Sequence, residues 1–129
     1  MSTRHAVLTP EAPAAIGPYS QAVKAGGTVY VSGQLGVDPA TGGFAGLDAA
    51  AQTRRALMNL SAVLQAAGSG LDEVVKVTVY LADMEAFGEV NRVYAEFFRP
   101  PFPARACIQA ARLPKSALVE IEAVAVGRA

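Results

Sequence analysis

The chain has 129 residues, of which 52% are hydrophobic and 17% are charged. This length suits one domain spanning residues 1–129 with a real core, and the composition excludes a disordered chain. Eleven basic and eleven acidic residues give no net charge, so a broad basic surface for nucleic acid is not expected. The single cysteine, Cys107, excludes an intramolecular disulfide, and no apolar segment is long enough to span a membrane. We therefore expect a soluble cytoplasmic protein without a membrane partner.

The first part of the sequence predicts three strands and a long loop. Residues 4–8 suit an edge strand, and residues 20–25 and 28–32 suit a hairpin turned by Gly26-Gly27. Residues 33–46 contain five glycines but neither of the glycine spacings that mark phosphate-binding loops, so they predict a turn-rich loop.

Three residues of this part are candidate ligand contacts. Tyr19 follows a rigid turn at Gly17-Pro18 and could offer its hydroxyl or ring edge to a ligand. An ordinary half-buried tyrosine is at least as good an interpretation. Ser32 and Gly33, at the end of a predicted strand, are weak candidates when taken alone.

A first helix is predicted to run to about Ala67, with Asp48 as its N-cap and Gly68 as its left-handed end. Its core-facing positions recur at three- and four-residue intervals: Thr53, Leu57, Leu60, Leu64 and Ala67. Polar residues occupy the rest of its surface: Arg54, Arg55, Asn59 and Gln65.

Residues 72–81 predict a long strand, because β-branched residues dominate them. Alternation would place Val75, Val77, Val79 and Leu81 on one face and Val74, Lys76, Thr78 and Tyr80 on the other.

A second helix is predicted to begin at Asp83, its N-cap, and to end at Pro100-Pro101. Its stripe contains the apolar residues Phe87, Val90, Tyr94 and Phe98. Asn91 is the polar member of this stripe, and a satisfied core amide and a ligand contact are equally good interpretations of it.

The C-terminal part predicts two short strands that carry unexpected charge. In the first, Arg105, Cys107 and Gln109 share one face. In the second, Glu120 and Glu122 share a face with Val124 and Val126, opposite Val119, Ile121, Ala123 and Ala125. Buried charges are costly unless they are paired or used, so these strands are the first place to look for a site.

The predicted order is β-β-β-α-β-α-β-β, an α+β fold in which two helices pack on one face of a mixed sheet of about six strands. Two helices cover one face only, and the other face keeps valines beside Tyr80, Lys76 and the acidic pair. A half-apolar face of this size is unstable in water. We therefore expect a closed homo-oligomer with sites at its subunit seams.

Arg105 and the two glutamates allow two interpretations. A guanidinium at a sheet surface can bind a planar carboxylate through two hydrogen bonds, but it can equally form an internal salt bridge to Glu120 or Glu122. If Arg105 pairs with one glutamate, the other is free, and a desolvated carboxylate can exchange protons with water or substrate. For Glu122 itself, a solvated charge at a strand end is the preferred interpretation.

Cys107 is better interpreted as a small buried residue than as a nucleophile. The only histidine, His5, lies far away in a terminus expected to be mobile, so no base is available to activate the thiol. The same single histidine argues against a Ser-His-Asp triad and against a metal site.

Six fragments in order together resemble the RidA (YjgF) family, and the resemblance covers essentially the whole chain. They are Ile16-Gly17-Pro18-Tyr19-Ser20-Gln21-Ala22, Val31-Ser32-Gly33-Gln34, Val90-Asn91 with Tyr94, Pro103-Ala104-Arg105-Ala106-Cys107, Arg112-Leu113-Pro114-Lys115 and Glu120-Ile121-Glu122-Ala123. Each fragment is weak alone, but the set is specific. Ala106 stands where the family often has serine.

The resemblance implies a chorismate-mutase-like fold and a homotrimer with three clefts between subunits. It also implies cofactor-free hydrolysis of reactive 2-imino or 2-enamino acids, such as 2-aminoacrylate and 2-iminobutanoate, to 2-keto acids and ammonia. Carried over, Arg105 would bind the substrate carboxylate, and Glu120 with the backbone carbonyl of Cys107 would position the water. Tyr19, Ser32, Gly33 and Asn91 would line the cleft.

Two alternatives remain open from the sequence. One is a carboxylate-binding regulator or chaperone-like trimer without turnover, whose sequence would look the same. The other is a ribonuclease or translation inhibitor, which the neutral charge and the single histidine disfavour.

Overall fold

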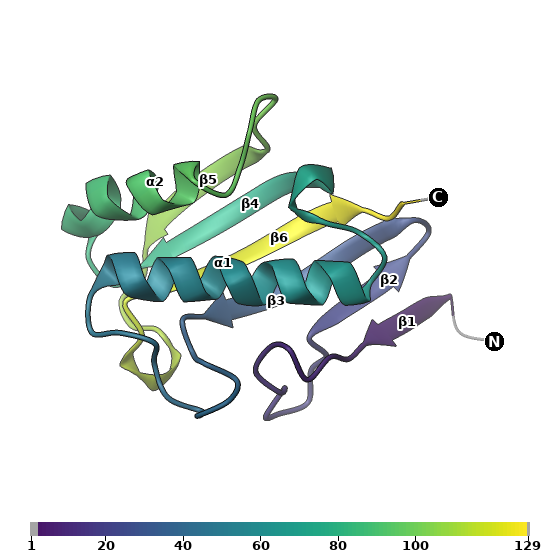
Figure 1. Cartoon of the computed structure of the whole chain (residues 1–129), viewed down its shortest axis with the longest axis horizontal. Helices are drawn as coiled ribbons and strands as arrows, with labels where there is room; N and C mark the ends of the chain where they lie inside the picture. The colour runs from purple at the N-terminus through teal and green to yellow at the C-terminus, as the bar shows by residue number, and fades with distance from the viewer. Residues whose placement is uncertain (1–2, 129) are drawn as a thin grey trace.

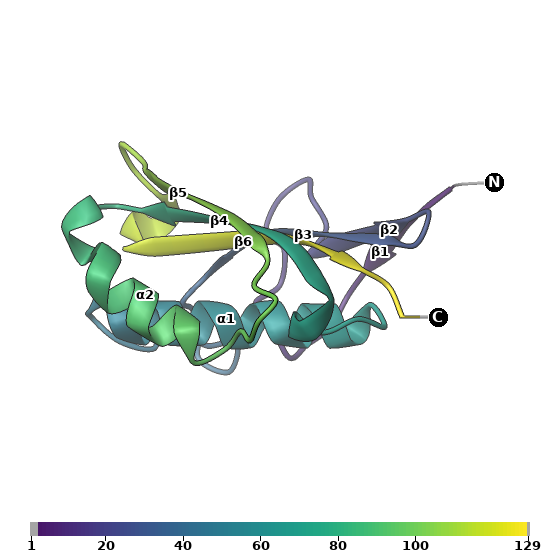
Figure 2. The same ribbon diagram turned by 90° about the horizontal axis from the view of Figure 1, so that it is seen from above.

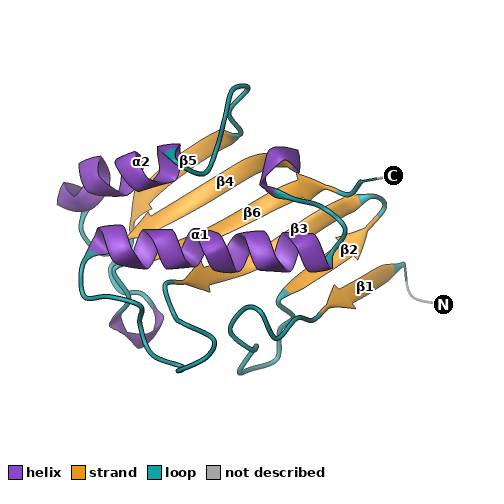
Figure 3. Cartoon of the chain, in the orientation of Figure 1, coloured by secondary structure: helices purple, strands orange, loops and turns teal. Residues whose placement is uncertain are grey.

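A six-stranded mixed sheet with two helices on one face forms the computed structural model, which describes residues 3–128 (Figures 1 and 3). The strands are β1 (Arg4–Val7), β2 (Ala22–Ala25), β3 (Thr28–Leu35), β4 (Val74–Leu81), β5 (Ala104–Gln109) and β6 (Val119–Val126). Their order across the sheet is β1-β2-β3-β6-β4-β5, and only β4 and β5 pair in parallel. The predicted α+β class is confirmed.

Both helices, α1 (Ala49–Ala66) and α2 (Phe87–Ala95), lie on the same side of the sheet (Figure 2). Asp48 caps α1 as predicted, since its Oδ1 accepts a hydrogen bond from the Ala51 N–H at 2.8 Å. Beyond the helix, Gly68 has a φ of +78°, the left-handed conformation that favours glycine. Neither helix of the described residues is long and apolar enough to cross a membrane.

The core lies between the helix layer and the sheet. The fully buried side chains of α1 include Leu57, Leu60 and Leu64, which pack with the inward residues of the central strands, Val77, Val79 and Ile121 among them. Each buried leucine stabilises the fold by about 1.5–3 kcal/mol relative to an exposed one. This layer fixes which face of the sheet is closed and which is left open.

The predicted alternation of β4 is wrong at its start. A shift in the pairing with β6 falls between Val74 and Lys76, so one extra residue is inserted there. As a result Val74 is buried against the core, while Val75 is 50% exposed. Val75 therefore lies on the open face, where Val74 was expected.

A second bulge extends β3 beyond its predicted end at residue 32. The pairing with β6 shifts between Val31 and Gln34, so Ser32 and Gly33 lie in the bulge and the strand continues to Leu35. The glycine-rich loop thus begins after Leu35 and not at Gly33.

Other element boundaries also differ from the predictions: β1 ends at Val7 and not at residue 8, and β2 begins at Ala22 and not at residue 20. Residues Leu71–Glu73 form a short 3₁₀ turn, so β4 begins two residues later than expected. Asp83 caps another 3₁₀ turn, Met84–Ala86, and α2 follows it and ends at Ala95, five residues before Pro100.

The open face carries side chains that are apolar and exposed. They include Tyr30, Val75, Ile108 and Val126, which are between 46% and 51% exposed. Glu120, Glu122 and Tyr80 share this face. Such a face in one protomer is the kind of surface that a second protein surface covers.

Candidate active site

The predicted site residues separate into two groups on opposite faces of the sheet. Arg105 pairs in register with the buried Val77 and therefore lies on the helix-covered face, at the edge strand β5. Glu120 pairs with Tyr80 and Leu35 and lies on the open face. The two groups are called here the arginine half-site (Arg105, Asn91, Cys107, Phe87 and Tyr94) and the glutamate half-site (Glu120, Gly33, Tyr19 and Ser32).

An internal salt bridge between Arg105 and Glu120 or Glu122 is therefore wrong for the protomer. β4 lies between β5 and β6, and the charges point to opposite sides of it. The salt bridges found among residues 3–128 involve other side chains, Arg54 with Glu96 and Arg128 with Asp72 and Glu73.

In the arginine half-site, α2 holds the guanidinium. Arg105 Nη1 donates a hydrogen bond of 2.7 Å to Asn91 Oδ1. Asn91 is therefore not a core amide, and its side chain orients Arg105. The guanidinium carbon lies 4.7 Å from the centre of the Tyr94 ring and 5.6 Å from that of Phe87, within cation–π range. One N–H of five is engaged by Asn91, which leaves the fork available to a planar anion.

Tyr94 connects this half-site to the core. Its ring stacks on Phe98 with 4.6 Å between ring centres, and burial raises the pKa of its hydroxyl, an effect that the Arg105 charge partly offsets. The hydroxyl is buried and has no hydrogen-bond partner among the described residues. Tyr94 thus contributes a ring face to Arg105 and not a hydrogen bond.

Cys107 lies two residues beyond Arg105 on the same strand face and is partly buried. Burial raises the pKa of its thiol, and the nearby Arg105 charge offsets only part of this rise. A thiol with a raised pKa is a weak nucleophile at neutral pH. Because β5 is an edge strand, one side of its backbone has no strand partner within the described protomer.

The glutamate half-site lines a cavity of about 140 Å³. Its polar walls include Glu120, Tyr19, Gln21 and Lys115, and its apolar walls include Pro13, Ile16, Leu35, Val37 and Pro114. Gly33 faces the carboxylate closely: a Cβ at this position would overlap the Glu120 carboxylate, so a larger residue here would displace that side chain. The structure thus brings Tyr19, Gly33 and Glu120 together.

Ser32 supports this cavity from behind, by binding the backbone of the loop that carries Tyr19 and Gln21. Its Oγ donates a hydrogen bond of 2.6 Å to the carbonyl of Ser20, beside Tyr19. The next residue, Gln21, is buried and donates to the carbonyls of Thr9, Ala12 and Pro13. These bonds fix the N-terminal loop over Glu120.

Glu120 and Glu122 have different surroundings. Burial raises the pKa of the Glu120 carboxyl, and the neighbouring Glu122 charge raises it further. Glu122 is not the solvated strand-end charge that the sequence favoured, because the Tyr80 hydroxyl donates to its Oε1 at 2.8 Å. This bond to a carboxylate also raises the pKa of Tyr80.

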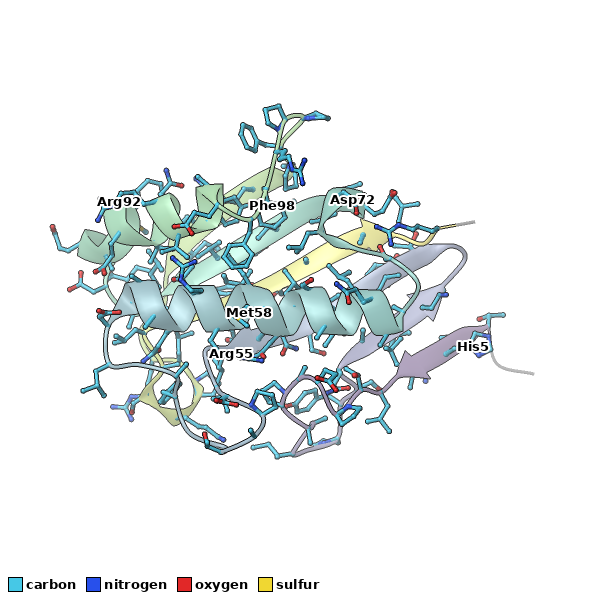
Figure 4. The ribbon with its side chains drawn as sticks, in the orientation of Figure 1. His5, Arg55, Met58, Asp72, Arg92 and Phe98 are labelled. Carbon is cyan, nitrogen blue, oxygen red and sulfur yellow. The ribbon has the colours of Figure 1, made fainter. Side chains whose placement is uncertain are left out.

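His5 lies in strand β1 and not in a mobile segment, and Figure 4 shows it at the opposite end of the molecule from Arg92 on α2. Within residues 3–128, no group of three or more His, Cys, Asp or Glu side chains could hold a metal ion.

Sequence reasoning missed Phe87, Tyr94 and Tyr80 as parts of the site. The sequence places Phe87 in an apolar stripe, and Tyr94 in that stripe and in one motif of the resemblance, but it gives neither ring a contact with Arg105. Nothing in a 3.6-residue period distinguishes a ring that packs in the core from one that faces a guanidinium. The left-handed backbone of Lys115 and Ser116, with φ of 57° and 58°, was equally invisible to it.

Comparison with known proteins gives a consistent result. The family model described as Endoribonuclease L-PSP matches residues 9–127. The RutC family protein y4sK of Sinorhizobium fredii is 52% identical over 118 residues, covering 92% of this chain and 94% of its own. The 2-iminobutanoate/2-iminopropanoate deaminase of Bos taurus is 52% identical over 123 residues, and the match covers 95% of this chain and 90% of that protein.

A solved structure agrees with these sequence matches. The crystal structure of RidA from the Antarctic bacterium Psychrobacter sp. PAMC 21119 superposes with a TM-score of 0.91 at 45% identity, covering 95% of this chain and 98% of its own. The fold, the order of the motifs and the matched residues 9–127 therefore agree: the chain belongs to the Endoribonuclease L-PSP family, which is the RidA (YjgF) family.

Proposed function

We propose that this protein hydrolyses reactive 2-imino and 2-enamino acids to 2-keto acids and ammonia, as a cofactor-free 2-iminobutanoate/2-iminopropanoate deaminase. One observation carries the proposal: the protomer presents a guanidinium with open donors on one face and a carboxylate in a cavity on the other. Relatives that this chain matches over 90% or more of their length are named for this activity, including the proteins of Bos taurus and Homo sapiens.

Arg105 would bind the substrate carboxylate. Asn91 holds Nη1, and the Tyr94 and Phe87 rings restrict the plane of the guanidinium, so the remaining N–H groups are oriented before substrate arrives. A bidentate guanidinium–carboxylate pair is short and directional, which fixes the 2-imino carbon at a defined distance from Arg105.

Glu120, with the backbone carbonyl of Cys107, would position and activate the water. Water adds to the imine carbon, its oxygen forming the C–O bond while the imine nitrogen takes up a proton. The product is a tetrahedral carbinolamine. Loss of ammonia from this intermediate, as the hydroxyl proton leaves, gives the C=O of the 2-keto acid. Glu120 would take one proton and return it, a role that suits a carboxyl whose pKa burial raises.

A complete site requires two protomers, because Arg105 and Glu120 lie on opposite faces of one. We propose a homotrimer in which the open faces pack together and the arginine half-site of one subunit meets the glutamate half-site of the next. The exposed apolar residues of the open face support this assembly. We expect the trimer to act in the cytoplasm on small carboxylates, without a metal, a membrane or nucleic acid as partner.

Replacing Arg105 by Ala tests the proposal. The substrate imine is generated in situ by an amino-acid oxidase, and keto-acid release is followed with and without the protein. We expect Arg105→Ala to lower kcat/KM by roughly 10²–10³-fold, the effect of losing a charge-assisted bidentate contact of about 3–4 kcal/mol. An unchanged rate would contradict the proposal. Saturable binding of a keto acid by the wild type without any turnover would instead favour a carboxylate-binding regulator.

A further inference from the structure

Glu122 lies beside Glu120 on the open face of β6, and the mechanism above gives it no role. The two carboxylates are two residues apart on one strand face, so their backbone positions differ by roughly 7 Å. Glu122 is held in place, since its Oε1 accepts a 2.8 Å hydrogen bond from Tyr80. Because the Glu122 carboxylate is fixed in position, its charge acts on the neighbouring Glu120 side chain in a constant geometry.

Tyr80 is placed to join the two carboxylates. In the sheet register its partner is Glu120, while the partner of Glu122 is Thr78. The Tyr80 side chain therefore starts opposite Glu120 and reaches diagonally to Glu122, a distance that aromatic side chains span across strands. Tyr80 thus has its backbone opposite one carboxylate and its hydroxyl bonded to the other.

Other ionisable groups face this cluster from each neighbouring element. Tyr30 on β3 and Lys76 on β4 both pair with Val124, two residues beyond Glu122. Lys115 of the Pro114–Ser116 turn and Tyr19 of the N-terminal loop line the same cavity as Glu120. Neither lysine is hydrogen-bonded to Glu120 or Glu122 among the contacts of residues 3–128, so the hydrogen bond from Tyr80 is the contact that holds the acidic pair.

We propose that Glu122, oriented by Tyr80, is a positioning residue for the reaction, whose fixed negative charge acts on the neighbouring Glu120 carboxylate as that group takes a proton from the attacking water. The inference rests on the function proposed above. A like charge nearby disfavours the ionised form of Glu120, so it raises the pKa of that carboxyl, in the direction that burial also produces. A stronger base transfers protons more readily but is ionised over a narrower pH range.

Glu122→Gln separates this role from a structural one, because it changes the pH profile in two opposite ways. Removing the charge lowers the pKa of Glu120, so the acid limb of kcat moves to lower pH. The plateau of kcat at neutral pH falls severalfold, since the base is weaker, while KM stays unchanged. A variant that is merely less well folded would lose activity at every pH.

A direct titration gives a readout that needs no turnover. The side-chain carboxyl carbons of ¹³C-labelled glutamate are followed by NMR against pH, with the Glu120 signal assigned by its loss in Glu120→Gln. We expect the Glu120 midpoint to fall in Glu122→Gln and to fall by less in Tyr80→Phe, which keeps the ring but loses the hydrogen bond. A variant that carries both Glu122→Gln and Tyr80→Phe should have the same Glu120 midpoint as Glu122→Gln alone, because Tyr80 acts through Glu122.

Glu11→Gln is the matched control. It removes the same charge from an exposed residue that lines a groove on the helix-covered side of the molecule. We expect it to move neither the NMR midpoint nor the acid limb. An unchanged or higher Glu120 midpoint in Glu122→Gln overturns the proposal, and so does a lower midpoint with an unmoved acid limb. A wild type that releases no keto acid would overturn the proposed function and this role with it, while the NMR midpoint would still report the coupling of the two carboxylates.

Discussion

Arg105 and Glu120 acquire their chemistry from a few immediate neighbours. Asn91 and two aromatic rings orient Arg105, whereas Gly33 and the N-terminal loop enclose Glu120. The sequence indicated that both residues matter, because charge in an apolar strand is unusual. It did not indicate their orientation, because the faces of β5 and β6 relative to α2 depend on sheet order, which no local pattern contains.

Gly33→Ala tests how tightly Glu120 is positioned. The added Cβ would overlap the carboxylate and displace it, which we expect to lower kcat/KM by about 10²-fold, the usual effect of a misplacement of about 1 Å. Since the displaced atoms belong to the end of a flexible side chain, the free energy of unfolding should fall by less than about 1 kcal/mol. Keto-acid release and urea denaturation measure the two effects.

Gly43→Ala provides the control for Gly33→Ala, because a Cβ there meets only the Thr41 Oγ1 at 3.8 Å. It should leave both quantities unchanged. Equal losses of activity in both variants would show that the close approach of Gly33 to Glu120 has no special consequence.

At the scale of elements, α1 supports the site through its buried polar residues. Asn59, assigned from the sequence to the polar surface of the helix, is fully buried and donates to the carbonyls of Leu35 and Val37 at 3.0 and 2.8 Å. Those two residues line the Glu120 cavity. Gln52 acts similarly, accepting from the Leu118 N–H and donating to the Gly46 carbonyl. Helix α1 therefore fixes the loops around the glutamate half-site.

Asn59→Ala should destabilise the protein by about 3 kcal/mol, because two buried carbonyls lose their donor. Urea denaturation at one fixed protomer concentration measures this loss. Gln65→Ala, on the exposed surface of the same helix, should change stability by less than about 0.5 kcal/mol. A loss in Asn59→Ala no larger than that of Gln65→Ala would show that the loop is held in another way.

The elements also show where sequence patterns stop being informative. The ends of α1 were predictable, because Asp48 and Gly68 have specific roles in capping. The bulges at Ser32-Gly33 and at Val74–Lys76 were not, since an inserted residue shifts the register without a required residue type. The bulge at Ser32-Gly33 lies at the Glu120 cavity, so the local feature that matters most for the site was the least visible in the sequence.

At the scale of the molecule, the exposed apolar residues of the open face are the main support for the proposed trimer. Val75 is 50% exposed there in the protomer, and Met58 on the outer side of α1 is 45% exposed. In an isolated protomer, lysine at either position would have a similarly small effect. In the proposed trimer only Val75 is covered.

Val75→Lys should therefore dissociate the trimer, while Met58→Lys should leave it intact. Burying three unpaired ammonium groups near one another is strongly unfavourable, so we expect sedimentation to show mainly protomers at micromolar concentration. Keto-acid release should fall with the loss of trimer, because each site would lose half of its residues. A trimer that survives Val75→Lys would show that another surface forms the assembly.

The proposed active site combines Arg105 of one subunit with Glu120 of another. Arg105→Ala and Glu120→Gln variants carrying different tags are mixed, unfolded and reassembled in equal amounts, and mixed trimers are confirmed by sequential capture on both tags. Each variant alone should be nearly inactive. Random assembly should restore about a quarter of the wild-type activity, because each mixed trimer regains one of its three sites. Mixed trimers without any recovered activity would contradict the shared site directly.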